Sequence, residues 1–129
     1  MIQLKYPLFW LLSGWVFVIA VIFVSVSPIV EFAAFKVNWE DKTLHAVTYF
    51  LLMIWFSGLY KRRHQVVVAV FVMALGFFLE MIQLRLPYRY FEPADLVANG
   101  IGVLAGLGLS LWLLAGWCQR IEGRLRYHA

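Results

Sequence analysis

Long stretches without formal charge dominate this sequence and decide which folds are open to it. Three of them, residues 6–30, 43–60 and 96–119, contain no Asp, Glu, Lys or Arg. A fourth stretch, residues 65–84, contains one charged residue, Glu80. A helix crosses the hydrocarbon core of a bilayer with about 20 predominantly apolar residues. Of the 129 residues, 64% are hydrophobic and 14% are charged, whereas soluble domains average about 45–50% and about 25%. The sequence therefore predicts a membrane protein and excludes an ordinary soluble domain, a disordered region and a fibrous repeat.

The four stretches are interpreted as four membrane-spanning helices. Open β structure leaves backbone groups unpaired in lipid, and stretches of this length lack the alternating pattern of barrel strands. We expect an all-α polytopic membrane protein, a four-transmembrane-helix bundle that forms a single domain over residues 1–129. The first stretch is longer than the apolar core of a signal peptide, about 7–15 residues, and is interpreted as an uncleaved helix. The predicted helices cover about residues 7–28, 39–60, 65–85 and 94–118.

The Lys and Arg residues between the predicted spans indicate the orientation, because cytoplasmic loops of membrane proteins are enriched in them. One side of the bundle carries seven and the other carries four. We therefore expect the N and C termini to lie in the cytoplasm. Since the net charge of +4 is divided between both sides instead of forming one stripe, no nucleic-acid partner is expected. The larger group is Lys5, Lys61, Arg62, Arg63, Arg120, Arg124 and Arg126, and the smaller is Lys36, Lys42, Arg85 and Arg89.

Polar residues recur at one depth in three of the predicted helices. Inserting a charge at a helix centre costs about 2.5–3.5 kcal/mol, so ionisable residues within spans mark candidate functional sites. With a rise of about 1.5 Å per residue, His45, Glu80 and Asn99 each lie within about 6 Å of the outer end of their helix. Residues three or four apart share a helix face, so Tyr49 and Asp95 extend the same stripes. The sequence therefore predicts a polar pocket that opens toward the outer surface.

The candidate residues of this pocket include two cations, which suit a phosphate group. Each residue alone also has a structural interpretation. A histidine near the interface often snorkels, a first-turn aspartate interacts with the helix dipole, and amides join helices by hydrogen bonds. Their common depth favours a shared site over separate structural roles. The predicted ligand-binding residues are Lys42, His45, Tyr49, Glu80, Gln83, Arg89, Asp95 and Asn99.

Small residues recur at every fourth position along the last predicted helix. They are Ala98, Gly102, Gly106 and Ser110, and the two glycines form a GxxxG pattern, which lets another helix approach closely. The pattern fits either packing within the bundle or a homodimer face. Packing is favoured, because Gly102 continues the polar stripe of its helix.

An ordered series of polar residues and glycines resembles the VanZ-like family of bacterial membrane proteins. The series covers about residues 41–106 and reads Asp41-Lys42-x-x-His45-x-x-x-Tyr49, Gly76-x-x-x-Glu80-x-x-Gln83, Pro87-x-Arg89 and Asp95-x-x-x-Asn99-x-x-Gly102-x-x-x-Gly106. The family takes its name from a component of glycopeptide-resistance clusters that raises tolerance to teicoplanin, a lipid-bearing cell-wall antibiotic. The resemblance implies a role in the cell envelope and a multi-pass location in the bacterial cytoplasmic (inner) membrane.

Three functions fit these observations. The leading hypothesis is a binding protein whose pocket holds the head group of an anionic membrane lipid or a lipid-linked cell-wall intermediate. The second is a membrane-embedded enzyme acting on a lipid phosphate, acyl or glycosyl group, with His45, Glu80 and Asp95 as candidate catalytic residues. The third is a small accessory subunit that docks on a larger membrane-protein partner. No cofactor is predicted. The ligand types permit a divalent metal, but no metal site is predicted because the sequence has neither an HExxH motif nor carboxylates at metal-ligand spacing.

Overall fold

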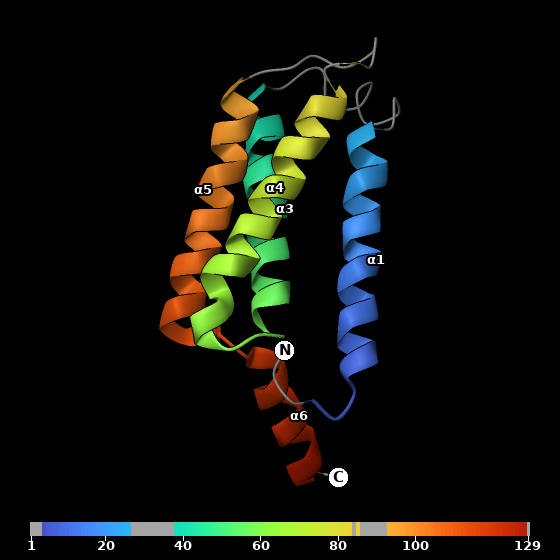
Figure 1. Cartoon of the computed structure of the whole chain (residues 1–129), viewed down its shortest axis with the longest axis vertical. Coiled ribbons are helices and arrows are strands. Elements are labelled where there is room, and N and C mark those ends of the chain that lie inside the picture. The colour runs from blue at the N-terminus through green and yellow to red at the C-terminus, as the bar shows by residue number, and fades with distance from the viewer. Residues whose placement is uncertain (1–3, 27–37, 84, 86–92, 129) are drawn as a thin grey trace.

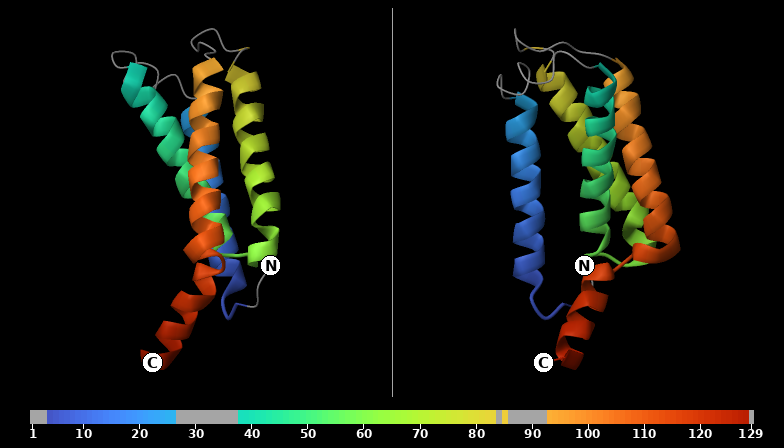
Figure 2. Two further views of the ribbon diagram at one scale, coloured as in Figure 1. Left: turned by 90° about the vertical axis from the view of Figure 1, so that its left-hand side faces the viewer. Right: turned by 180° about the vertical axis from the view of Figure 1, so that it is seen from behind.

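The computed structural model describes residues 4–26, 38–83, 85 and 93–128, and all regular structure in these ranges is helical. Four helices lie side by side, and a fifth extends beyond them at the end where the first begins (Figure 1, Figure 2). The four are α1 (Pro7–Val26), α3 (Asn38–Ser57), α4 (Gln65–Gln83) and α5 (Pro93–Leu109), and the fifth is α6 (Trp117–His128). A short 3₁₀ helix, Arg62–His64, precedes α4, and a π-helical turn, Ser110–Leu114, follows α5.

Three candidate membrane spans lie in the described part of the chain, and each is long and apolar enough to cross a bilayer. They are Pro7–Val24, Arg62–Ile82 and Ala94–Leu114, and α3 carries a shorter apolar segment, His45–Ser57. Large apolar side chains are exposed along these helices, to an extent that an aqueous surface rarely carries. The all-helical prediction is confirmed for the described residues and three predicted spans have the required length and composition, whereas the fourth span stays a prediction.

Helix α3 contacts each of the other three helices of the bundle, and its contact with α5 is the most extensive. Two glycines of α5 make this close approach possible. A Cβ atom at Gly102 would overlap the carbonyl oxygen of Ala46, and one at Gly106 would come within 2.8 Å of the Met53 side chain. In lipid, helices associate through such close van der Waals packing. The GxxxG glycines therefore lie in a contact within the chain, which is the arrangement that packing within the bundle requires.

A buried glutamate joins the beginning of α1 to α6. Glu122 accepts hydrogen bonds from the backbone N–H groups of Lys5 and Tyr6 and, at 3.0 Å, from Nε1 of Trp10. The ring centroid of Trp10 lies 5.4 Å from that of Trp117, which is the first residue of α6. These contacts fix α6 against the end of the bundle.

The predicted fourth helix, residues 94–118, is divided in the structure. The π-helical turn follows α5, and Gly116 then adopts a φ of 73° before α6 begins. Glycine enters this left-handed conformation without the steric cost of a Cβ atom and commonly ends helices there. The backbone N–H of Gly116 donates to the carbonyl oxygen of Ser57 at 3.0 Å, so the break is held against the end of α3. The expectation of one continuous helix is corrected accordingly.

Candidate functional site

Polar side chains from three helices meet near one end of the bundle. Helices α3 and α5 begin at this end and α4 ends there (Figure 1). His45 lies about two turns into α3, Glu80 lies in the last turn of α4, and Asp95 and Asn99 occupy the first two turns of α5. We call these four residues the polar cluster.

The polar cluster is held together by short contacts between helices. Nδ1 of His45 lies 3.0 Å from Oδ1 of Asn99 and 3.8 Å from Oε1 of Glu80. Asp95 joins this group, because one ligand atom each from His45, Glu80 and Asp95 lie within 4.8 Å of one another. The exposed fraction is 2% for Glu80 and Asn99 and 5% for Asp95, against 19% for the His45 side chain. The cluster is therefore a buried group that is reached from the His45 side.

A glycine on α4 allows the polar cluster to close. A Cβ atom at Gly76 would lie 3.1 Å from Cε1 of Tyr49 and 3.2 Å from Nδ2 of Asn99. Tyr49 is buried one turn along α3 from His45, so its ring lies beside the polar cluster on the side toward the middle of the bundle. Nδ2 of Asn99 is buried and finds no hydrogen-bond partner among the described residues. Buried amides normally have such a partner, which makes this atom an unused donor.

The polar cluster combines one imidazole with two carboxylates. These groups can accept hydrogen bonds from hydroxyl and amine groups and can transfer protons. They are also among the ligand types that bind divalent metals. The members of this group come from three helices and from distant positions, so no single local motif contains all of them. The signals available from the sequence were their predicted common depth, their spacing along shared helix faces and the family resemblance.

For three other residues of the predicted site, the structure does not describe the side chain. Arg89 belongs to a segment beyond the described ranges. Lys42 lies in α3 and Gln83 ends α4, but the side chains of both are outside the description.

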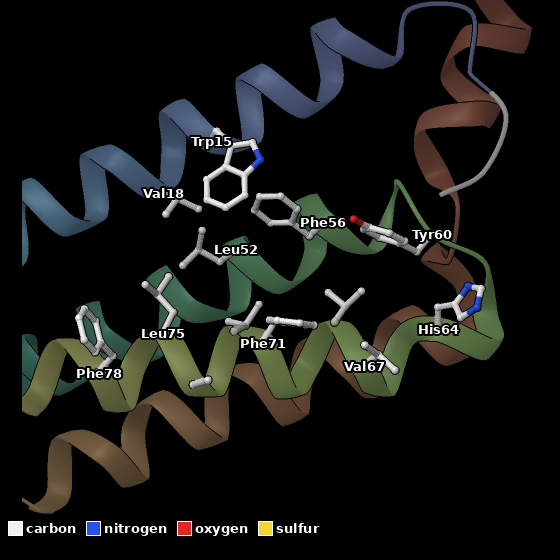
Figure 3. Close-up of a pocket in the computed structure, with 13 residues that line it drawn as sticks. Trp15, Val18, Leu52, Phe56, Tyr60, His64, Val67, Phe71, Leu75 and Phe78 are labelled. Carbon is white, nitrogen blue, oxygen red and sulfur yellow. The ribbon is translucent and has the colours of Figure 1, made fainter.

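An apolar cavity of about 710 Å³ lies between α1, α3 and α4 (Figure 3). Tyr60 and His64 lie at one end of it and Phe78 lies toward the other. Its lining includes no residue of the polar cluster. The sequence did not reveal this cavity, because its lining residues have the same composition as residues that face lipid. The lining consists of Trp15, Val18, Leu52, Phe56, Tyr60, His64, Val67, Val68, Phe71, Val72, Ala74, Leu75 and Phe78.

A buried glutamine that the sequence did not single out fixes the turn between α3 and α4. Nε2 of Gln65 donates to the carbonyl oxygens of Ser57 and Tyr60 at 3.0 Å and of Lys61 at 3.3 Å. Gln65 is fully buried, so its amide satisfies carbonyls that would otherwise be costly to bury. Its position as a lone amide at the start of an apolar helix was the available signal.

The model of the VanZ/LLP1 family matches residues 9–114, a range that contains α1, α3, α4 and α5 except for the first residues of α1, together with the entire polar cluster. No curated protein and no solved structure matches the chain. The matched range covers most of the sequence and encloses the series of residues on which the resemblance rests, and the chain therefore belongs to the VanZ/LLP1 family.

Proposed function

We propose that this protein is a four-span inner-membrane protein that binds the head group of an anionic lipid or of a lipid-linked envelope intermediate. The family suggests a cell-envelope protein associated with glycopeptide resistance. The observation that carries the proposal is the polar cluster, in which three helices direct ionisable and amide groups to one buried point. Such residues are expensive inside a membrane and are mainly kept where they bind or react.

The chemistry of the polar cluster suits a head group that has both phosphate and hydroxyl or amide groups. Carboxylates of Glu80 and Asp95 accept hydrogen bonds from hydroxyl and amine groups, and the amide of Asn99 offers a donor. The phosphate needs cations, which Lys42 and Arg89 supply in this proposal. His45 is the most accessible member, so the head group enters past its ring.

The apolar cavity supports a lipid as the ligand class. A volume of about 710 Å³ between α1, α3 and α4, lined almost entirely by hydrocarbon and aromatic side chains, suits an acyl or polyprenyl chain and does not suit a hydrated solute. An amphiphile reaches both features sideways through the bilayer and needs no aqueous chamber.

Native mass spectrometry of the purified chain in nanodiscs tests this function. The probes are phosphatidylglycerol and a polyprenyl phosphate, with phosphatidylethanolamine as the zwitterionic comparison. We expect retention of the anionic lipids by the unmodified protein, and at least tenfold weaker retention by His45→Ala and Asn99→Ala. The matched control is Glu122→Gln, which alters a buried polar residue at the other end of the bundle and outside the lining of the apolar cavity. Equal retention by the unmodified protein and all three variants would contradict a head-group site at the polar cluster.

A second candidate function is a membrane-embedded enzyme that acts on a lipid phosphate. The observation that favours it is the contact of His45 with both Glu80 and Asn99, because a general base is typically oriented by a second polar group. Incubation of nanodiscs with a radiolabelled polyprenyl phosphate or phospholipid tests for product release. Turnover that is lost in Glu80→Gln and kept in Glu122→Gln, which alters a buried glutamate at the other end, supports catalysis. An absence of turnover in the unmodified protein would contradict the enzyme function.

A further inference from the structure

We propose that His45, Glu80 and Asp95 bind a divalent transition-metal ion, Zn²⁺ or Mn²⁺. One ligand atom from each residue lies within 4.8 Å of the other two. Ligands held about 2.1 Å from a single metal ion lie roughly 3–3.5 Å apart, so a shift of about 1 Å per side chain completes the arrangement. Because each ligand is carried by a different helix of a packed bundle, the backbone holds all three near the binding distance.

The ligand types select the metal. The set contains one imidazole nitrogen and two carboxylates, whereas Ca²⁺ and Mg²⁺ prefer oxygen ligands alone. Imidazole favours Zn²⁺, and carboxylates also suit Mn²⁺. Two ionised carboxylates and a neutral histidine match the charge of a divalent ion. This match matters because uncompensated charge is costly in a buried, apolar setting.

Asn99 gives a second, independent indication of a ligand at this point. Its Oδ1 lies 3.0 Å from Nδ1 of His45. Metal-bound histidines almost always donate such a hydrogen bond from the ring nitrogen that does not bind the metal, which fixes the ring orientation and tautomer. In this arrangement Nδ1 donates to Asn99 and Nε2 is the nitrogen that binds the metal. Nδ2 of the same amide is buried and has no hydrogen-bond partner among the residues that the structure describes. An oxygen bound to the metal, from water or phosphate, supplies the acceptor that this donor needs.

Three protein ligands leave at least one coordination position open, as in catalytic rather than structural zinc sites. A phosphate oxygen of the lipid head group fits that position. This extension rests on the proposed function, whereas the metal site itself does not.

The test measures metal binding by the full chain in nanodiscs of phosphatidylcholine, which contain no anionic lipid. The protein is stripped with EDTA, equilibrated with Zn²⁺ or Mn²⁺, and its metal content and affinity are measured by plasma mass spectrometry and chelator competition. We expect about one equivalent per chain. We expect affinity to fall at least tenfold in His45→Ala and Asp95→Asn, and about 10–100-fold in Asn99→Ala, which removes an outer-shell partner. The matched controls His64→Ala and Glu122→Gln keep the affinity of the unmodified protein.

Two measurements on the unmodified protein keep the proposal open to refutation if the variants fold poorly. Added Zn²⁺ raises Tm if it binds the folded state, and X-ray absorption at the zinc edge shows nitrogen and oxygen ligands without sulfur. Less than about a tenth of an equivalent, sulfur ligation, or loss of binding in His64→Ala alone would overturn the site. Metal binding that persists without any lipid retention would overturn the proposed function and leave the metal site standing.

Discussion

Single buried polar residues at the two ends of the bundle have different tasks. At the α6 end, Glu122 accepts hydrogen bonds from Lys5, Tyr6 and Trp10, all of which lie within or just before the first turns of α1. At the opposite end, Glu80 lies 3.8 Å from Nδ1 of His45 within a group of three potential metal ligands. The first glutamate satisfies backbone and indole donors and joins the ends of the chain, whereas the second belongs to a candidate binding site.

Replacement of Glu122 tests its structural task. Glu122→Ala leaves three N–H donors without their acceptor, and we expect a loss of about 1–3 kcal/mol in the free energy of unfolding. Thermal unfolding in detergent, followed by the fluorescence of the tryptophans near this end, measures the change. Glu122→Gln keeps one oxygen acceptor and is expected to lose less. An equal loss in both variants would show that the negative charge, and not the acceptor, is what stabilises this end.

The one cysteine of the chain is a poor reporter in the folded protein. Cys118 is fully buried, and burial, together with the negative charge of Glu122, raises the pKa of its thiol to about 12. The thiol therefore stays protonated through neutral pH, whereas an unfolded cysteine titrates near about 8.5. Because the folded pKa is the higher one, this group makes stability fall as pH rises from about 8.5 toward the folded value.

Labelling kinetics with a maleimide check this prediction. Between pH 7 and 9, folded protein is expected to react at least tenfold more slowly than protein unfolded in detergent and urea. The exposed variant Lys61→Cys, made with Cys118→Ser, is the control for reagent activity. Fast labelling of folded Cys118 would show that α6 does not stay against the bundle.

At the scale of elements, two glycines set the distance between α3 and α5. A Cβ atom at Gly102 meets the backbone carbonyl of Ala46, which cannot rotate away as a side chain can. We expect Gly102→Ala to destabilise the protein by about 1–3 kcal/mol, the usual cost of overpacking, and to weaken binding at neighbouring His45. Gly108→Ala is the matched control, because nothing lies within 4 Å of a Cβ there and alanine favours a helix by up to about 1 kcal/mol. Thermal unfolding of both variants measures this difference in stability. Equal stability of Gly102→Ala and Gly108→Ala would contradict the close contact between α3 and α5.

The elements differ in how far the sequence predicts them. Long stretches with at most one charged residue located α1, α4 and α5, because lipid excludes charge and the helix must contain its own hydrogen bonds. The break at Gly116 was missed, since a glycine inside an apolar stretch is compatible with a continuous helix until the Ser57 carbonyl is seen to bind its N–H.

The site was predicted in part for a related reason. Spacing along a helix gives the height and the face of a residue, and this placed His45, Glu80 and Asn99 at one level. It does not give the rotation of one helix about another. The approach of three ligand atoms to within 4.8 Å and the apolar cavity between α1, α3 and α4 both depend on that rotation and became visible only in the fold.

For the whole molecule, the central question is whether α3 crosses the bilayer. Its apolar segment, His45–Ser57, spans about 20 Å at about 1.5 Å per residue, less than the roughly 30 Å of hydrocarbon. We nevertheless expect it to cross, because α3 contacts α1, α4 and α5 and its buried face is shielded from lipid by protein. Its polar first turns then lie at the outer interface, where flanking residues snorkel and the bilayer thins at modest cost.

Cysteine accessibility tests this topology in a Cys118→Ser background. Lys36→Cys and Arg85→Cys are expected to react with an impermeant maleimide from outside intact spheroplasts, and Lys61→Cys only in inverted vesicles. This pattern requires both α3 and α4 to cross, with the polar cluster toward the outer leaflet and the basic turn at Lys61 in the cytoplasm. If Lys36→Cys and Lys61→Cys react from the same side, α3 does not cross the bilayer. The protein then has three membrane spans instead of four.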